Sequence, residues 1–277
     1  MSLWLCVQVA GAVTFRAVID DARWDLESSK FSCRLSQSVP DYGRALFEQE
    51  AGEDVRFSLQ SVQRVRASSE ALLVAEAPPW QPGTAPRVIG SVQVDDASGV
   101  IDVGSAHARQ MLAYLQQGLV PTFTRGGWQG TGESLRVGVS AANFPAAYRE
   151  YSGCIERLLP VNYRQIARTA VLFPSAVVTL SDAARERLDL IALYVRNDDS
   201  VRSVYVDGHS DNLGRRLLNR DLSKRRAEEV TRYLVSQGVD EAMVTTRFHG
   251  ERYPVVPNSS PQNRDRNRRV TVRLERN

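Results

Sequence analysis

Two charged residues in the second half of the chain, Asp211 and Arg226, have types and spacing that suit binding of a small charged ligand. Asp211 follows the predicted strand VRSVYVDGHS in an Asp-Asn-Leu-Gly turn, which places its carboxylate at the carboxyl end of the strand. Arg226 falls in a predicted helix beginning at Leu222, on the same stripe as Leu222 and Val230. A cation on such a stripe needs an anion, so the two residues are candidates for one site.

The same spacing is compatible with a purely structural ion pair between Arg226 and either Asp211 or Asp221, and spacing alone favours that alternative. Other chemistry is not indicated. His107, His209 and His249 lack metal-ligand spacing, so we expect no metal site and no cofactor. Neither the paired carboxylates of a glycosidase nor an activated nucleophile is recognisable, because His209, Ser210 and Asp211 share one turn. The sequence therefore predicts a protein that is not an enzyme.

The region from about residue 158 alternates strand and helix patterns in the order β-α-β-α-β-β. Ser181 or Asp182 can cap the first helix, whose core stripe is predicted to contain Ala184, Leu188, Ile191 and Val195. Gly238 ends the second helix. The predicted elements are RTAVLF, SDAARERLDLIALYVRN, VRSVYVDGHS, LSKRRAEEVTRYLVSQG, MVTTRFHG and RRVTVRLE.

The first half contains short alternating runs separated by Pro, Gly and Ser, which indicate antiparallel strands over 55–62, 71–77, 87–94 and 134–140. Two helices interrupt them. Ser105 is the predicted cap of one, with Met111, Leu112 and Leu115 on its apolar face, and the other is NFPAAYREYSGCIERLL. The strands are too few and too short for an outer-membrane barrel. The fold class is therefore α+β: a mainly antiparallel β domain followed by a β-α-β-α-β-β sandwich.

Charge and hydropathy exclude two classes of protein. Residues 1–160 hold 14 Lys and Arg against 17 Asp and Glu, whereas residues 161–277 hold 21 against 15. The cations of the second half are scattered among acids, which argues against a nucleic-acid-binding protein. After the amino terminus no run of about 20 apolar residues occurs, so we expect no transmembrane segment in the mature chain.

The amino-terminal segment MSLWLCVQVAGAVTF has a short apolar run followed by small residues, which is typical of a secretory signal peptide. It lacks the usual preceding basic residues, so either the natural start lies upstream or the segment is a buried first strand. We favour a signal peptide over residues 1–16. Cys6 lies inside this run without the neighbours that lipidation requires.

Cys33 and Cys154 are the two cysteines that remain in the mature chain. In an exported protein such a pair favours a disulfide over free thiols or metal ligands, because the periplasm is oxidising and no other ligands are near. A bridge across so long a loop stabilises by about 4 kcal/mol.

The second half resembles the OmpA-type peptidoglycan-binding family over roughly 110 residues, through the segments GHSDNLGRRLLNRDLSKRRAEEVTRYLVSQGV, HGERYPVVPN and NRDRNRRVTV. The resemblance implies that the ligand is diaminopimelate of the peptidoglycan stem peptide. It implies that Asp211 binds the ammonium and Arg226 the carboxylate, while Asn219, Leu222 and Arg268 shape the groove. A guanidinium can clamp a carboxylate with two parallel hydrogen bonds, which suits this assignment. Ser210 stands where the family commonly has Thr.

The first half contains the motifs IDDARW (19–24), CRLSQSVPDYGRALF (33–47), APPWQPG (77–83), PTF (121–123), Trp128 and Cys154. Through these motifs it resembles the MotY family of sodium-driven polar flagellar motors. The resemblance implies a disulfide between Cys33 and Cys154 and a periplasmic protein of the flagellar basal body. Its partners would be peptidoglycan and basal-body or stator proteins, with a MotX-like protein as a further candidate.

The predicted organisation is therefore a signal peptide over 1–16, a basal-body-association domain over 17–157 and a peptidoglycan-binding domain over 158–277. The leading hypothesis is a structural anchor of the T ring that couples the motor to the cell wall. The alternative is a general envelope-stability protein with the same wall-binding domain. Trp24, Trp80 and Trp128 are expected to be core residues, and no partner-contact residues are assigned in the first half.

Overall fold

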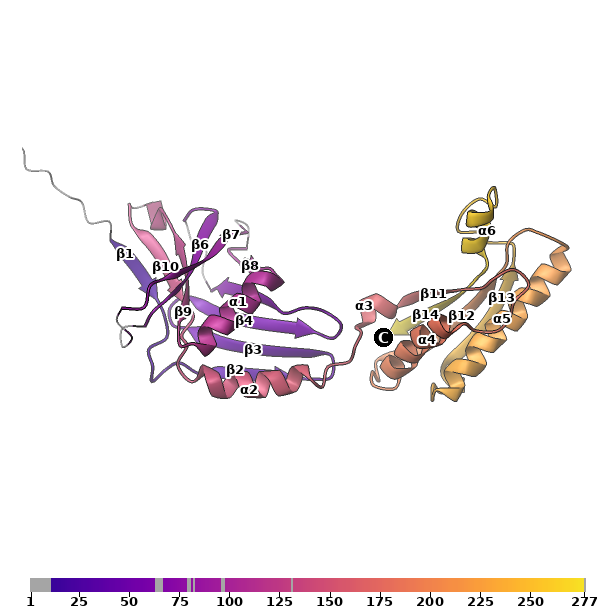
Figure 1. Cartoon of the computed structure of the whole chain (residues 1–277), viewed down its shortest axis with the longest axis horizontal. Helices are drawn as coiled ribbons and strands as arrows, with labels where there is room; N and C mark the ends of the chain where they lie inside the picture. The colour runs from indigo at the N-terminus through magenta and orange to yellow at the C-terminus, as the bar shows by residue number, and fades with distance from the viewer. Residues whose placement is uncertain are drawn as a thin grey trace, which may run out of the picture. The chain divides into compact units, whose positions relative to one another are not determined.

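The computed structural model describes residues 11–62, 67–78, 81, 83–95, 98–130 and 132–276. The chain divides between Leu158 and Leu159 into two compact units, which are described separately (Figure 1). Within the described residues, sheets rich in antiparallel pairs make up the N-terminal unit, and the C-terminal unit alternates strands and helices. The α+β prediction is confirmed.

One sheet of the N-terminal unit is antiparallel throughout its described strands and has the order β2-β3-β4-β5-β8. Each strand up to β5 pairs with the next one along the chain, as in a meander. The predicted strand at 55–62 is β5, whereas β2, β3, β4 and β8 were not predicted. The strands are β2 (Trp24–Ser28), β3 (Ser32–Val39), β4 (Gly43–Glu50), β5 (Arg56–Ser61) and β8 (Ile101–Val103).

The second sheet of this unit has the order β1-β10-β9-β6-β7, and β1 pairs with β10 in parallel. The predicted strands at 71–77, 87–94 and 134–140 correspond to β6, β7 and β10. The part of the predicted signal peptide that precedes Gly11 lies outside the described residues, whereas Ala12–Phe15 forms β1, in agreement with the alternative of a first strand, although that strand is not buried. The elements are β1 (Ala12–Phe15), β6 (Glu70–Glu76), β7 (Arg87–Gln93), β9 (Val120–Arg125), the 3₁₀ turn η1 (Trp128–Gly130) and β10 (Ser134–Gly138).

Two helices, α1 (Ser105–Gln116) and α2 (Phe144–Ile155), pack against the sheets of this unit. Met111, Leu112 and Leu115 of α1 are buried as predicted. The predicted cap was wrong: Gly104 occupies the N-cap position, without a side-chain bond, and Ser105 is the first helical residue. The extended backbone continues from β8 to Gly104, which shifts the start of the helix by one residue.

Aromatic side chains fill the space between the two sheets. Phe57 and Phe123 stack with ring centroids 5.6 Å apart, and Trp24 packs edge-on against Phe144 at 5.0 Å. The indole Nε1 of Trp24 donates to the carbonyl oxygen of Ala142 at 3.2 Å. Trp128 packs at the core margin, whereas Trp80 lies outside the described residues. The described tryptophans are therefore packing residues.

A disulfide joins Cys33 in β3 to Cys154 in α2, with Cα atoms 6.0 Å apart across 121 residues of sequence. Both side chains are buried in the core of the N-terminal unit. The bridge fastens the last helix of this unit to a strand near its beginning. This arrangement matches the predicted disulfide.

The C-terminal unit is a four-stranded sheet of order β11-β14-β12-β13 within the described residues, with β12 and β13 parallel and the other pairs antiparallel. Buried residues of α4 and α5 cover one face of it. The elements are α3 (Tyr163–Ile166), β11 (Arg168–Leu172), α4 (Asp182–Val195), β12 (Val201–His209), α5 (Arg216–Ser236), η2 (Glu241–Met243), β13 (Val244–Gly250), α6 (Pro261–Asn267) and β14 (Arg269–Arg276).

The structure bears out the stripe of α4 and changes the limits of α5. Ser181 caps α4 by accepting the N–H of Ala184, and the four predicted core residues of α4 are buried. Helix α5 begins at Arg216, six residues before the predicted Leu222. The prediction missed these first turns because they expose Leu217 and Leu218 and show no apolar periodicity. Short helix α6, rich in polar residues, was also not predicted.

Close packing of α5 on β12 requires a glycine at position 208. A Cβ atom there would lie 2.2 Å from the carbonyl oxygen of Ser223 in α5. The backbones of the helix and strand therefore approach closely. This approach brings Arg226, one turn beyond Ser223, over the end of the sheet.

The disulfide generates the first prediction. Replacing Cys33 and Cys154 by Ala, or reducing the protein, is expected to lower the free energy of unfolding of the N-terminal unit by about 2–5 kcal/mol, because the unfolded chain gains freedom. Urea denaturation followed by tryptophan fluorescence measures this unit selectively, since all four tryptophans precede Leu159. Reductant should have no further effect on the double variant, and an unchanged midpoint would contradict the prediction.

Candidate functional site

A pocket of about 300 Å³ in the C-terminal unit brings together all five residues predicted to bind the ligand. Asp211 comes from the turn after β12, and Asn219, Leu222 and Arg226 come from the first half of α5. Arg268 follows α6 and precedes β14. The predicted helix start was wrong, yet these residues share the pocket because the chain turns directly from the strand into the helix.

Arg226 is fully buried, and its guanidinium is held by the loop that follows β11. Nε donates to the carbonyl oxygen of Val177 at 2.8 Å, and Nη2 donates to that of Pro174 at 2.7 Å. The guanidinium carbon lies 5.1 Å from the centre of the Phe173 ring. Nη1 is buried and has no hydrogen-bond partner among the described residues. Because Arg226 lines the pocket, this unsatisfied donor is available to an anion.

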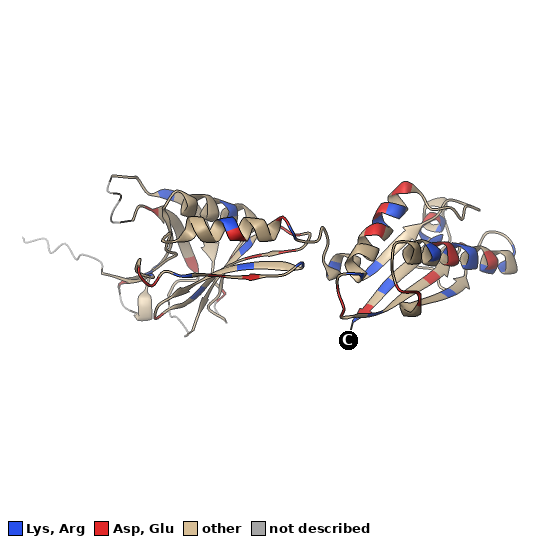
Figure 2. Ribbon diagram, turned by 90° about the horizontal axis from the view of Figure 1, so that it is seen from below, with Lys and Arg blue, Asp and Glu red and all other residues tan. Residues whose placement is uncertain are grey.

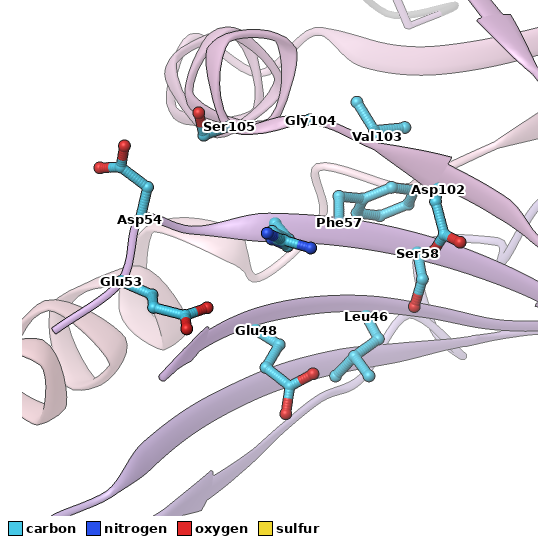
Figure 3. A pocket seen from close by; sticks show the side chains of 11 residues that line it. Leu46, Glu48, Glu53, Asp54, Phe57, Ser58, Asp102, Val103, Gly104 and Ser105 are labelled. Atoms are coloured by element: carbon cyan, nitrogen blue, oxygen red, sulfur yellow. The ribbon is translucent and has the colours of Figure 1, made fainter. Parts of the chain in front are cut away.

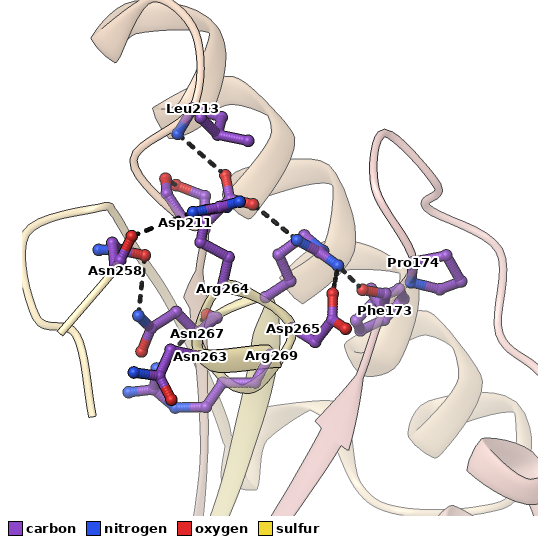
Figure 4. A network of polar contacts seen from close by, with 12 residues as sticks. Phe173, Pro174, Asp211, Leu213, Asn258, Asn263, Arg264, Asp265, Asn267 and Arg269 are labelled. Carbon is purple, nitrogen blue, oxygen red and sulfur yellow. Dashed lines mark hydrogen bonds and ion pairs between the residues drawn. The ribbon is translucent and has the colours of Figure 1, made fainter. Parts of the chain in front are cut away.

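The carboxylate of Asp211 is buried at the same pocket (Figure 4). Oδ1 accepts the N–H of Leu213 at 3.2 Å, which fixes the turn, and Oδ2 accepts Nη1 of Arg268 at 2.7 Å. Arg268 also donates through Nε to the carbonyl oxygen of Phe173 and pairs with Asp265. A carboxylate offers about four lone-pair sites, so Asp211 retains capacity for a further donor.

Arg226 does not form the structural ion pair that spacing alone favoured. Among the described residues, Asp211 pairs with Arg268, and Asp221 pairs with Arg225 at 3.0 Å on the exposed side of α5. The carbonyl oxygens of the loop after β11 take two donors of Arg226 instead. That loop contact was not foreseeable from spacing within the helix.

Asn219 and Leu222 form part of the pocket wall. Asn219 is buried and donates through Nδ2 to a carboxylate oxygen of Glu251 at 2.7 Å. Leu222 is half-buried one helical turn before Arg226. Asn219 therefore ties the start of α5 to the segment after β13, and Leu222 supplies apolar surface.

Positive charge exceeds negative charge around this pocket. Arg215, Arg225, Arg226 and Arg268 line it, with Asp211 as the acid among its lining residues. Burial and, to a smaller extent, the nearby Arg268 cation lower the pKa of Arg226 to about 10, while the Asp211 carboxylate opposes the shift. Arg226 thus stays charged at neutral pH, and a bound carboxylate would relieve the repulsion between the guanidinium groups.

Several lining residues were not predicted from the sequence. Ser175 and Ala176 enter from the loop after β11, where Ala176 has a φ of 59°. Leu213 and Leu218 line the pocket while remaining largely exposed. The Phe-Pro-Ser sequence at 173–175 is a turn signal that could have located this loop, but nothing local indicates that the loop would meet α5.

A larger groove of about 770 Å³ lies in the N-terminal unit, between β4, β5, β8 and the start of α1 (Figure 3). Two of its four acids have basic partners: Glu48 pairs with Arg34 at 2.5 Å and Asp54 with Arg109 at 2.9 Å. Across the described residues, no group of three or more His, Cys, Asp or Glu could hold a metal ion. In the same residues, no helix is long and apolar enough to cross a membrane.

Family comparisons match both units. The family model described as the MotY N-terminal domain matches residues 15–160, more than half of the chain. The chain belongs to the MotY family. The OmpA family model matches residues 172–268 of this MotY-family chain, a range that includes all five predicted site residues.

Individual relatives agree with these matches. The sodium-type flagellar protein MotY of Vibrio parahaemolyticus is 29% identical over 264 residues, which cover 94% of this chain and 89% of the relative. The peptidoglycan-associated lipoprotein of Pseudomonas aeruginosa is 32% identical over 147 residues, which cover 53% of this chain and 84% of the relative. Similarity to MotY thus spans both units, whereas the lipoprotein matches about half of this MotY-family chain.

Two solved structures resemble part of the chain. The C-terminal domain of Helicobacter pylori MotB has a TM-score of 0.37 and 22% identity, covering 39% of this chain and 85% of that one. The peptidoglycan-associated lipoprotein of Burkholderia pseudomallei has a TM-score of 0.37 and 24% identity, covering 38% and 89%.

The buried pair of Asp211 and Arg268 gives a stability prediction for this MotY-family chain. Arg268→Ala is expected to destabilise the C-terminal unit by about 3 kcal/mol, because it leaves a buried carboxylate without its ion-pair partner. Urea denaturation followed by far-ultraviolet circular dichroism measures the loss.

Arg225→Ala is the matched control, since it removes an exposed ion pair from the same unit. Its expected cost is below about 1 kcal/mol. Equal losses in the two variants would show that the Arg268 pair is not specially stabilising.

Proposed function

We propose that this protein is a non-catalytic anchor that connects the flagellar motor to peptidoglycan in the periplasm. Membership of the MotY family and similarity to the sodium-type flagellar protein MotY support the motor assignment. The OmpA family match, with similarity to a peptidoglycan-associated lipoprotein, supports wall binding by the C-terminal unit. The proposed domains are a signal peptide over 1–16, a motor-association domain over 17–157 and a wall-binding domain over 158–277.

One observation carries the binding proposal: a buried guanidinium with an unsatisfied donor shares a pocket with a buried carboxylate. The proposed ligand is diaminopimelate, whose free end carries both an ammonium and a carboxylate. Arg226 Nη1 would donate to the ligand carboxylate, and Asp211 would accept from the ammonium. Charge-assisted hydrogen bonds of this kind are short and strong.

The other pocket residues have supporting roles in this proposal. Arg268 holds Asp211 in place through its ion pair, and Asn219 fixes the start of α5 through Glu251. Leu222 offers apolar surface to the methylene chain of the ligand. The charged atoms that meet the zwitterion are thus separate from the groups that position them.

The N-terminal unit would attach to the basal body as part of a T ring, with stator proteins or a MotX-like protein as partners. Its disulfide supports this mechanical role, because a covalent bridge between β3 and α2 resists opening of the unit under load. An anchor of this type transmits force between motor and wall without chemical catalysis. Release of soluble muropeptides from purified sacculi would contradict the non-catalytic assignment.

The ligand assignment predicts loss of sacculus binding in two variants. Asp211→Ala and Arg226→Ala are each expected to weaken co-sedimentation with purified sacculi by a free energy of about 2–5 kcal/mol, because each leaves a ligand charge unpaired in the pocket. Circular dichroism establishes that the variants are folded. Arg226→Lys should also weaken binding, because it keeps the positive charge but lacks the planar guanidinium that donates several hydrogen bonds.

Arg232→Ala is the control, because Arg232 lies on the exposed side of α5 and pairs with Glu229. Free diaminopimelate should compete with sacculi for the wild-type protein, whereas 1,5-diaminopentane, which keeps both ammonium groups and lacks both carboxylates, should compete poorly. Full sacculus binding by an Asp211 and Arg226 double variant would defeat the site assignment. Equal competition by 1,5-diaminopentane would defeat the ligand assignment.

The motor role predicts a motility defect. A strain lacking this protein should fail to swim while keeping an intact envelope, and Asp211→Ala should reproduce the defect because the motor would lose its hold on the wall. Swimming speed and leakage of a periplasmic enzyme measure the two properties. Normal swimming with a leaking envelope would favour the general envelope-stability alternative instead.

A further inference from the structure

A second pocket, of about 380 Å³, lies on the sheet face of the C-terminal unit that α4 and α5 leave uncovered. Alternate residues of a strand point to opposite faces, so the buried valines of β12 and β14 face the helices while Asp207, Thr271 and Arg273 face the other way. Figure 2 shows Lys and Arg positions, in blue, along the strands of this unit. No residue of this pocket lines the proposed diaminopimelate site.

The acid in this pocket is already matched by basic groups. Arg247 donates to both oxygens of Asp207, from Nε at 2.7 Å and from Nη2 at 2.9 Å. The Nε2 atom of His249 lies 3.0 Å from the same carboxylate. Arg273 pairs with Glu275 at 2.9 Å. These contacts leave Arg168 and Arg269 without an acidic partner within the described part of the chain.

The positions of Arg168 and Arg269 place like charges together. Arg168 on β11 lies directly opposite Arg273 on β14, a cross-strand pairing that is unfavourable for two cations. Arg269 is buried, and its hydrogen bonds go to the backbone oxygens of Asn267 and Tyr253. Burial lowers the pKa of Arg269 and the Arg168 cation lowers it further, while the Asp207 carboxylate opposes the shift. Neither guanidinium group forms an ion pair with an acid of the described residues, and Asp207 is engaged by Arg247 and His249.

A buried imidazole completes this side of the pocket. His209 is 6% exposed, and its Nδ1 has no hydrogen-bond partner among the described residues. Its ring stacks on that of His249, with centroids 5.1 Å apart. The pKa of His209 is lowered to about 4, mainly by burial and then by the neighbouring charges of Arg269, His249 and Arg168, while Asp207 opposes the shift. The ring is neutral at pH 7, so one of its two nitrogens carries a proton.

We propose that this pocket binds the phosphate group of a ligand through Arg168, Arg269 and His209. Two guanidinium groups supply two positive charges, which match a phosphate dianion. Each guanidinium presents several N–H donors in a plane, a geometry suited to phosphate oxygens. Nδ1 of His209, when it carries the proton, donates to a third oxygen. The phosphate could belong to a soluble compound or to a lipid headgroup, because both present the same oxygens.

Phosphate titration of the full chain at pH 7 tests the proposal. Inorganic phosphate should shift the imidazole NMR signals of His209 and His249, and the dissociation constant should follow from the titration. Arg168→Gln and Arg269→Gln should each weaken binding at least about tenfold, since each removes one charge-assisted contact. Arg168 is exposed, so its variant stays informative if Arg269→Gln destabilises the fold.

Arg202→Gln is the matched control, because Arg202 is exposed on β12 outside the lining of either C-terminal pocket. Asp211→Ala should retain phosphate binding, which separates this site from sacculus binding. Co-sedimentation with phosphatidylglycerol vesicles, compared with phosphatidylcholine vesicles, identifies the source. If the protein binds the anionic vesicles and this binding depends on Arg168, the ligand is a lipid headgroup. If the protein binds inorganic phosphate but not the anionic vesicles, the ligand is a soluble compound. No phosphate binding, or equal binding in the Arg168, Arg269 and Arg202 variants, would overturn the proposal.

Discussion

The burial of the Arg226 guanidinium is the constraint on which the C-terminal pocket depends. A fully buried cation is costly unless polar groups surround it, and the carbonyl oxygens of Pro174 and Val177 meet two of its three nitrogens. The ring of Phe173 covers its face. These contacts fix the loop after β11 against α5. The third nitrogen remains unsatisfied, so the arrangement that secures the loop also leaves one donor for an anion.

A second set of contacts positions the acidic side of the pocket. Asn267, at the end of α6, accepts the N–H of Val255 at 2.9 Å and donates to the carbonyl oxygen of Val256 at 2.8 Å. It thereby holds the segment between β13 and β14 and fixes the neighbouring Arg268. Arg268 in turn joins Asp211 to the carbonyl oxygen of Phe173. Phe173 therefore contacts both arginines, which couples the two charged halves of the site.

The sequence predicted the elements that carry strong periodicity and missed those that do not. The stripe of α4 and the strand ending at His209 were predictable because apolar residues recur at the proper period. The first turns of α5 expose Leu217 and Leu218, and α6 is mainly polar, so their helices follow from tertiary contacts instead. Family resemblance chose the five site residues, whereas spacing alone favoured an ion pair that does not form. Loop residues Ser175 and Ala176 reach the pocket through long-range packing, which no local pattern encodes.

The two-layer architecture also explains why one small unit carries two separate charged pockets. Gly208 lets α5 approach β12 closely, so charged residues at the start of that helix are drawn to the strand end and partly buried there. Helices α4 and α5 leave the opposite face of the same sheet uncovered, and period-two alternation directs polar residues such as Asp207 and Thr271 onto it. On the helix side each buried charge is held by backbone oxygens or a buried partner. On the open side the arginines also exceed the acids, and the proposed phosphate would offset that excess.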